Sequence, residues 1–162
     1  MKRKFFYIVF IAGLLTFSAM NLNAQNPRET AYLESIANIV GHDLYISYVY
    51  LGSLSDSYVY RVYHQKVAIN FFNEYVDYIK IIQRQLELMR EKQLVPIADI
   101  DYINMQIAAY ESLRKQALEF LKYIETGESK YVETFEKHRI QSWTLIATIL
   151  GIPEEIEKVY KK

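Results

Sequence analysis

Apolar residues recur along most of the chain at the spacing of an α-helix. This pattern predicts four long amphipathic segments, at residues 28–51, 57–92, 97–126 and 129–150. In each segment an apolar residue returns every three or four positions, which places these residues on one face of a helix. The third segment has the cleanest stripe, formed by Ile100, Ile103, Ile107, Tyr110, Leu113, Ala117, Leu121 and Ile124. No alternation typical of a strand extends beyond a few residues, so the pattern predicts an all-α protein.

Small and turn-forming residues mark where these segments end. Gly52 begins a serine-rich stretch that is predicted to separate the first two helices. Ser55 or Asp56 is the expected N-cap of the second helix, because its side-chain oxygen can accept a bond from a free backbone N–H. Gly127 is the predicted C-cap of the third helix, since glycine adopts the left-handed conformation without steric cost. Ser129 is the expected N-cap of the fourth.

Long amphipathic helices with short connections favour antiparallel neighbours. We therefore predict a four-helix up-and-down bundle, with an extended coiled-coil hairpin as the alternative. The bundle is preferred because apolar residues cover more than one narrow seam. Residues 154–161 are predicted to form a short extra C-terminal helix, with acidic residues at its start and lysines at its end, as the helix dipole favours.

The first 24 residues have the organisation of a secretory signal peptide. Three basic residues at positions 2–4 precede an apolar run at 5–17, shorter than the roughly 20 residues of a membrane-spanning helix. Ala24 supplies the small residue before the predicted cleavage site. We expect a single mature domain, residues 25–162, that is periplasmic or secreted and keeps no stable membrane anchor. An uncleaved N-terminal anchor is the alternative.

Composition argues against several kinds of site. The chain contains no cysteine, which excludes a disulfide, a thiol nucleophile and a cysteine-ligated metal. Its 19 Lys and Arg residues balance 19 Asp and Glu residues, whereas a nucleic-acid-binding protein is expected to be basic. Neither a glycine-rich phosphate loop nor a nucleophile beside a base is recognisable. We therefore expect a non-catalytic protein, assign no cofactor and expect no nucleic-acid partner.

Tyrosine is the main compositional excess. The chain has 15, and six of them fall within residues 45–63. A tyrosine combines a flat apolar ring with a polar hydroxyl, which suits a hydrated recognition surface. We therefore expect a binding or accessory module that contacts a protein, a small ligand or a second copy of itself through this end of the bundle. The predicted contact residues are Tyr45, Tyr48, Tyr58, Tyr60 and Tyr63. The alternative is that these rings belong to the core and its rim.

His138 suggests a second function. It lies on the apolar stripe of the fourth segment, where an inward-facing imidazole can bind a metal or another ligand. His42 and His64 lie off the main stripes, and no pair of Glu-x-x-His motifs typical of di-iron bundles occurs. The alternative functional prediction is therefore a ligand- or metal-binding bundle that uses His138. A hydrogen-bonded core histidine is the structural alternative.

Overall fold

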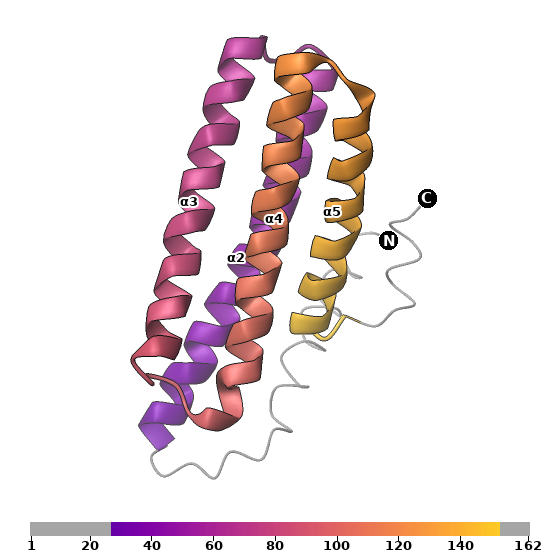
Figure 1. Cartoon of the computed structure of the whole chain (residues 1–162). Helices are drawn as coiled ribbons and strands as arrows, with labels where there is room; N and C mark the ends of the chain where they lie inside the picture. The colour runs from indigo at the N-terminus through magenta and orange to yellow at the C-terminus, as the bar shows by residue number, and fades with distance from the viewer. Residues whose placement is uncertain (1–26, 153–162) are drawn as a thin grey trace, which may run out of the picture.

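The computed structural model describes residues 27–152 and consists of four long helices and one 3-10 turn (Figure 1). The elements are α2 (Pro27–Val59), α3 (Gln65–Glu91), η2 (Ile97–Asp99), α4 (Ile100–Thr126) and α5 (Ser129–Ile149). The described part of the chain contains no strand, so the all-α prediction is confirmed. The signal peptide predicted at residues 1–24 and the helix predicted at 154–161 lie outside the described residues.

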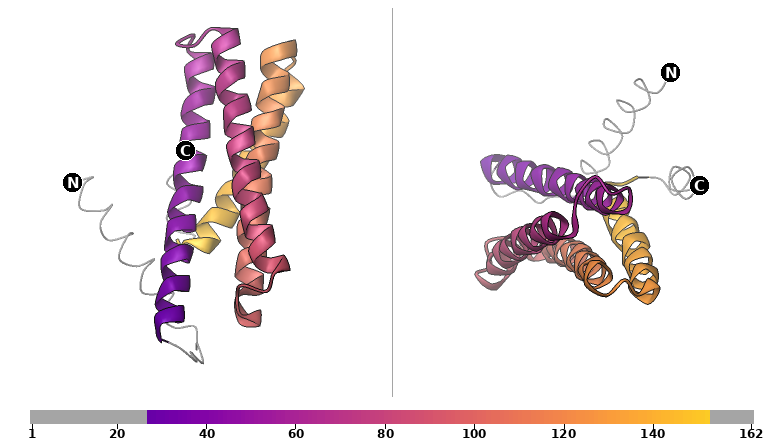
Figure 2. Two further views of the ribbon diagram at one scale, coloured as in Figure 1. Left: turned by 90° about the vertical axis from the view of Figure 1, so that its left-hand side faces the viewer. Right: turned by 90° about the horizontal axis from the view of Figure 1, so that it is seen from above.

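Consecutive helices run in alternating directions (Figure 1). Helices α3, α4 and α5 lie next to one another, with α4 in the middle, and α2 packs across this row (Figure 2). Helix α4 contacts both of its neighbours in the row, and α2 contacts all three of the other helices. These contacts are consistent with the predicted up-and-down bundle.

The core lies where the apolar faces of the four helices meet. Each helix contributes at least one fully buried aliphatic side chain, as in Leu51, Ile79, Leu113 and Ile146. An aromatic cluster extends this core, because the ring of Phe120 stacks on Phe72 at 5.0 Å and lies 4.9 Å from Phe135. Fully burying one side chain of this size contributes about 1.5–3 kcal/mol, so these contacts are the main support of the fold.

The first helix is longer than predicted. It continues through Gly52, and the turn to α3 occupies residues 60–64. Glycine costs about 1 kcal/mol inside a helix, but Leu51 and Leu54 on either side of it are both buried in the core. Their burial outweighs the cost of the glycine. The break predicted at residues 52–57 is therefore wrong.

The end of α4 is as predicted. Gly127 has a φ of 73°, in the left-handed region, and its N–H donates to the carbonyl of Tyr123 at 2.8 Å. This is the C-cap geometry that glycine favours. It lets the chain reverse within two residues and enter α5.

The predicted N-caps are wrong. Ser55 and Asp56 lie inside α2, where the Ser55 hydroxyl donates to a backbone carbonyl three residues earlier at 2.8 Å. The N-cap of α3 is His64, and the N-cap of α5 is Glu128 rather than Ser129. Neither residue makes a side-chain capping bond, so packing rather than capping positions the starts of these two helices.

Candidate functional site

The tyrosines predicted as a contact surface face different neighbours. The ring of Tyr48 lies 5.4 Å from Trp143 of α5, measured between centroids. Tyr58 packs edge-on against Phe120 of α4 at 6.1 Å. Tyr63 lies 5.2 Å from a phenylalanine of α3. These three rings are half-buried and divide their contacts among three helices, so part of the tyrosine excess stabilises the packing.

The remaining two predicted contact residues differ in exposure. Tyr45 is half-buried and packs against the core. Tyr60 is 78% exposed, the most accessible of the tyrosines between residues 45 and 63. It lies at the end of α2, where its N–H donates to the carbonyl of Asp56 at 2.8 Å. The binding role of these tyrosines stays a prediction, with Tyr60 the one best placed to meet a partner.

A polar cluster that the sequence analysis missed lies where α2 faces α3 and α4. Asp43 accepts a hydrogen bond from the hydroxyl of Tyr110 at 2.7 Å, and its other oxygen accepts one from the hydroxyl of Tyr78. Beside them the hydroxyl of Tyr75 donates to the carbonyl of Ser47 at 3.2 Å. These partners are separated by 28 to 67 residues in the sequence, so no local spacing indicates the cluster.

Burial and the neighbouring carboxylate keep these phenols protonated. Burial, followed by the hydrogen bond to Asp43, raises the pKa of Tyr78 to about 12. The same two causes raise the pKa of Tyr110, and burial raises that of Tyr75. At neutral pH the hydroxyls of Tyr78 and Tyr110 therefore act as donors that hold the Asp43 carboxylate in a fixed position.

A pocket of about 280 Å³ opens beside this cluster, between α2 and α3. Its lining includes Asp43, Ile46 and Tyr50 from α2 and Glu74, Tyr75 and Tyr78 from α3. Two carboxylates and three phenol rings thus share one small cavity. Among the side chains described between residues 31 and 152, no lysine, arginine or histidine forms an ion pair with Asp43 or Glu74. The described lining of the pocket is therefore acidic and aromatic and contains no cationic side chain.

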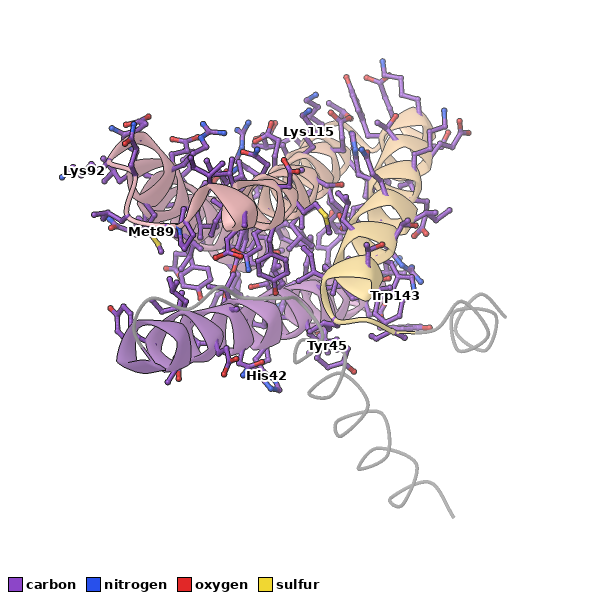
Figure 3. All side chains as sticks on the ribbon, turned by 90° about the horizontal axis from the view of Figure 1, so that it is seen from below. His42, Tyr45, Met89, Lys92, Lys115 and Trp143 are labelled. Carbon is purple, nitrogen blue, oxygen red and sulfur yellow. The ribbon has the colours of Figure 1, made fainter. Side chains whose placement is uncertain are left out.

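A second cavity, of about 40 Å³, lies between the first turns of α2, the end of α3 and the start of α4. Met89 of α3, which lies on the side facing α2 (Figure 3), lines it together with Leu33, Val95 and Ile103. This lining is mostly apolar, and the volume holds little more than a water molecule or two. The cavity is too small to receive an organic ligand without rearrangement.

His138, predicted to face inward, is half-buried on α5. Its carbonyl accepts hydrogen bonds from the hydroxyls of Ser112 and Ser142, at 3.3 and 2.8 Å. His42 points outward from α2 (Figure 3), and His64 lies at the start of α3. His138 lines neither of the two cavities above. Among the described residues no three His, Asp or Glu side chains are grouped to hold a metal ion, so the fold does not bring the three histidines together as ligands.

A second apolar stripe runs along the outer side of α2. We call it the outer stripe and define it as Tyr32, Ile39, Ile46 and Val49, which are 67%, 68%, 62% and 46% exposed. The first three are spaced seven residues apart and Val49 follows three residues later, so all four lie on one face of the helix. Helix α2 is therefore apolar on two sides, one facing the core and one facing outward.

Comparison with known proteins adds no family to this description. No protein-family model, curated protein or solved structure matches the chain. Across residues 27–152, none of the helices combines the length and apolar character needed to cross a membrane. The features that bear on function are therefore the outer stripe, the acidic pocket and the exposed residue Tyr60.

Proposed function

We propose that this protein is an exported, non-catalytic contact module that binds an amphipathic helix of a partner protein along the outer stripe of α2. Residues 1–24 support export to the periplasm or the medium, because they have the organisation of a signal peptide. Residues 154–161 are proposed to add a short terminal helix to the bundle. The observation that carries the proposal is the outer stripe.

The spacing of the outer stripe suits a helical partner. Apolar residues at intervals of seven and three form the seam on which a second helix packs, and exposed apolar faces of this kind commonly mark interaction sites. Tyr60 lies one residue past the end of α2 and two heptads after Ile46, with the polar Ser53 at the position between them. One of the tyrosines predicted as contact residues thus extends the proposed surface.

The area of the outer stripe limits the affinity to be expected. Burying the exposed part of its four side chains would contribute on the order of 4–7 kcal/mol. Association costs a comparable amount in lost translational and rotational freedom. Apolar packing alone is therefore insufficient, and the partner must add polar contacts around the stripe.

The charge of α2 indicates what those polar contacts are. Helix α2 carries four acidic residues, Glu29, Glu34, Asp43 and Asp56, against one arginine, Arg28, and no lysine. Two copies of this helix would bring like charges together, whereas a helix with basic flanks would be attracted. This argument favours a basic amphipathic helix over a second copy of the chain.

A designed peptide tests this proposal. A helical peptide with leucines at heptad positions and lysine flanks is titrated against residues 25–162 by fluorescence anisotropy, beside a peptide with the same leucines and glutamate flanks. We expect the basic peptide to bind at least about tenfold more tightly, which corresponds to about 1.4 kcal/mol. Ile39→Ser should abolish most of this binding.

Ile140→Ser is the matched control, since Ile140 is 54% exposed but lies on α5. It should leave binding unchanged, and circular dichroism checks that both variants stay folded. Equal binding of the two peptides, or equal losses in Ile39→Ser and Ile140→Ser, would show that α2 is not the docking surface.

A further inference from the structure

We propose that the acidic pocket between α2 and α3 is a binding site for an organic cation, which it holds by an alkylammonium group. The site consists of the carboxylates of Asp43 and Glu74 and the rings of Tyr50, Tyr75 and Tyr78. Ile46 belongs to both the outer stripe and the lining of this pocket. The inference does not depend on the outer stripe, because the carboxylates and rings that would hold the cation are not part of it.

The size and openness of the pocket suit a small headgroup. Its volume of about 280 Å³ lies just below the range of roughly 300–1,000 Å³ typical of drug-sized ligands. Tyr75 is only 4% exposed and forms the inner wall, whereas Tyr50 and Tyr78 are 45% and 40% exposed and form the rim. A ligand can therefore enter from solvent and lose part of its hydration on the inner wall.

The aromatic rings supply the first recognition element. The centroids of Tyr50 and Tyr75 are 6.1 Å apart, with an angle of 37° between the ring planes. A cation is attracted to the face of an aromatic ring when it lies within about 6 Å of the centroid. Several rings around one cavity form the arrangement by which proteins recognise quaternary ammonium groups.

The two carboxylates supply the second element. Asp43 is held in place by the hydroxyls of Tyr78 and Tyr110, and a carboxylate with two such bonds still has lone pairs for another donor. Glu74 is exposed at the rim. Within the described residues neither acid has a basic partner. A bound cation would provide the missing countercharge, while an anion would be repelled.

An alkylammonium group can come from a free amine, including its quaternary derivatives, or from a lysine side chain of another protein. The quaternary cation choline and the primary cation n-butylammonium represent the free amine, and Nα-acetyl-lysine amide represents the side chain. Two uncharged analogues of similar shape, 3,3-dimethylbutanol and Nα-acetyl-norleucine amide, report binding that needs no charge. Each is titrated into ¹⁵N-labelled residues 25–162, and amide shifts are followed by NMR.

We expect at least one cation to shift the amides of residues 43–50 and 74–78, and the uncharged analogues to leave them in place. Preference for choline or butylammonium would identify a free amine as the source, and preference for the lysine amide a partner protein. The absence of shifts with every cation at tens of millimolar, or equal shifts with the uncharged analogues, would overturn the proposal.

Variants test each recognition element. Glu74→Gln should weaken cation binding by about tenfold, because it removes a charge at the rim. Asp77→Asn is the control, since Asp77 lies on the same helix, pairs with Lys80 at 2.9 Å and does not line the pocket. It should change the affinity less than about twofold. Equal effects of the two variants would indicate general charge attraction and contradict a defined site.

Two variants of Tyr50 distinguish binding of the cation to the aromatic ring from simple apolar contact. Tyr50→Phe retains the aromatic face and should bind nearly as well as the unmodified chain, whereas Tyr50→Leu should bind several-fold more weakly. Because Tyr50 is 45% exposed, neither change is expected to affect folding. Identical affinities of the two variants would exclude a role for the ring.

Discussion

Gln116 of α4 places an amide group in the core, and its replacement tests whether this buried amide destabilises the fold. Its side chain is fully buried, and neither its Nε2 nor its Oε1 has a hydrogen-bond partner among the described residues. A buried polar group left without a partner costs about 1–3 kcal/mol. Gln116→Met removes the amide while keeping an unbranched side chain that adapts to irregular space. We therefore expect this variant to be more stable than the unmodified chain.

The size of the effect follows from three contributions. The penalty removed is about 1–3 kcal/mol, and additional apolar burial adds up to about 0.8 kcal/mol. The different shape of methionine in a close-packed core lowers the free energy of unfolding by up to about 1.5 kcal/mol. The free energy of unfolding should accordingly rise by about 1–2 kcal/mol. For a domain of this size each kcal/mol raises Tm by about 3–6 °C.

Urea unfolding followed by circular dichroism measures this change. The midpoint should rise while the m-value stays constant, because the surface exposed on unfolding hardly changes. Gln85→Met is the control, since Gln85 is exposed on α3, and it should stay within about 0.5 kcal/mol. If Gln116→Met lowers the free energy of unfolding by about 1 kcal/mol or more, the amide has a partner such as buried water and the reasoning fails.

Three further predictions concern backbone and charge. Gly127→Ala should cost about 1–2 kcal/mol in urea unfolding, because φ is 73° and a Cβ would meet no atom within 4 Å, which leaves backbone strain as the cause. Spectrophotometric titration should place the pKa of Tyr78 at about 12, and Asp43→Asn should lower this pKa. The contribution of the Tyr78 phenol to the free energy of unfolding is fully present below about pH 10, the unfolded-state pKa. It is lost as the pH rises through the folded-state pKa. The hydrogen bond from Arg114 lowers the pKa of Glu111, so the stability that this pair adds is present above the unfolded-state pKa of about 4.3 and is lost as the pH falls through the folded-state value. Glu111→Gln should reduce the loss of stability at acidic pH, measured as the free energy of unfolding in urea at a series of pH values.

The sequence predicts the helices better than it predicts their connections. Ile103, Leu113 and Leu121 are buried as their spacing indicates, because helical periodicity is a local property. The turn at residues 60–64 contains neither glycine nor proline, and Arg61 there adopts a φ of 60°. A positive φ is uncommon for a residue other than glycine, so no single residue of the turn signals this conformation.

The two candidate surfaces differ in how far the sequence can reveal them. Ile39 and Ile46 of the outer stripe are seven residues apart, so the stripe is visible in the sequence once the inner face of α2 has been assigned. Asp43 accepts a hydrogen bond from Tyr110, which is 67 residues away in the sequence. This contact depends on how α2 packs against α4. A site assembled from separate helices in this way becomes visible only when their packing is known.

The position of α2 has a consequence for how the chain assembles. Helices α3, α4 and α5 pack mainly against their neighbours in the sequence, whereas α2 packs against its neighbour α3 and also reaches α4 and α5 from far along the chain. Contacts between nearby segments form faster than distant ones, so the three-helix row should collapse first and α2 should close over it last. If the chain is exported as proposed, it crosses the membrane from its N-terminus, and α2 emerges before any helix that can cover it. With apolar residues on two sides, α2 is then the segment that a holdase chaperone should protect.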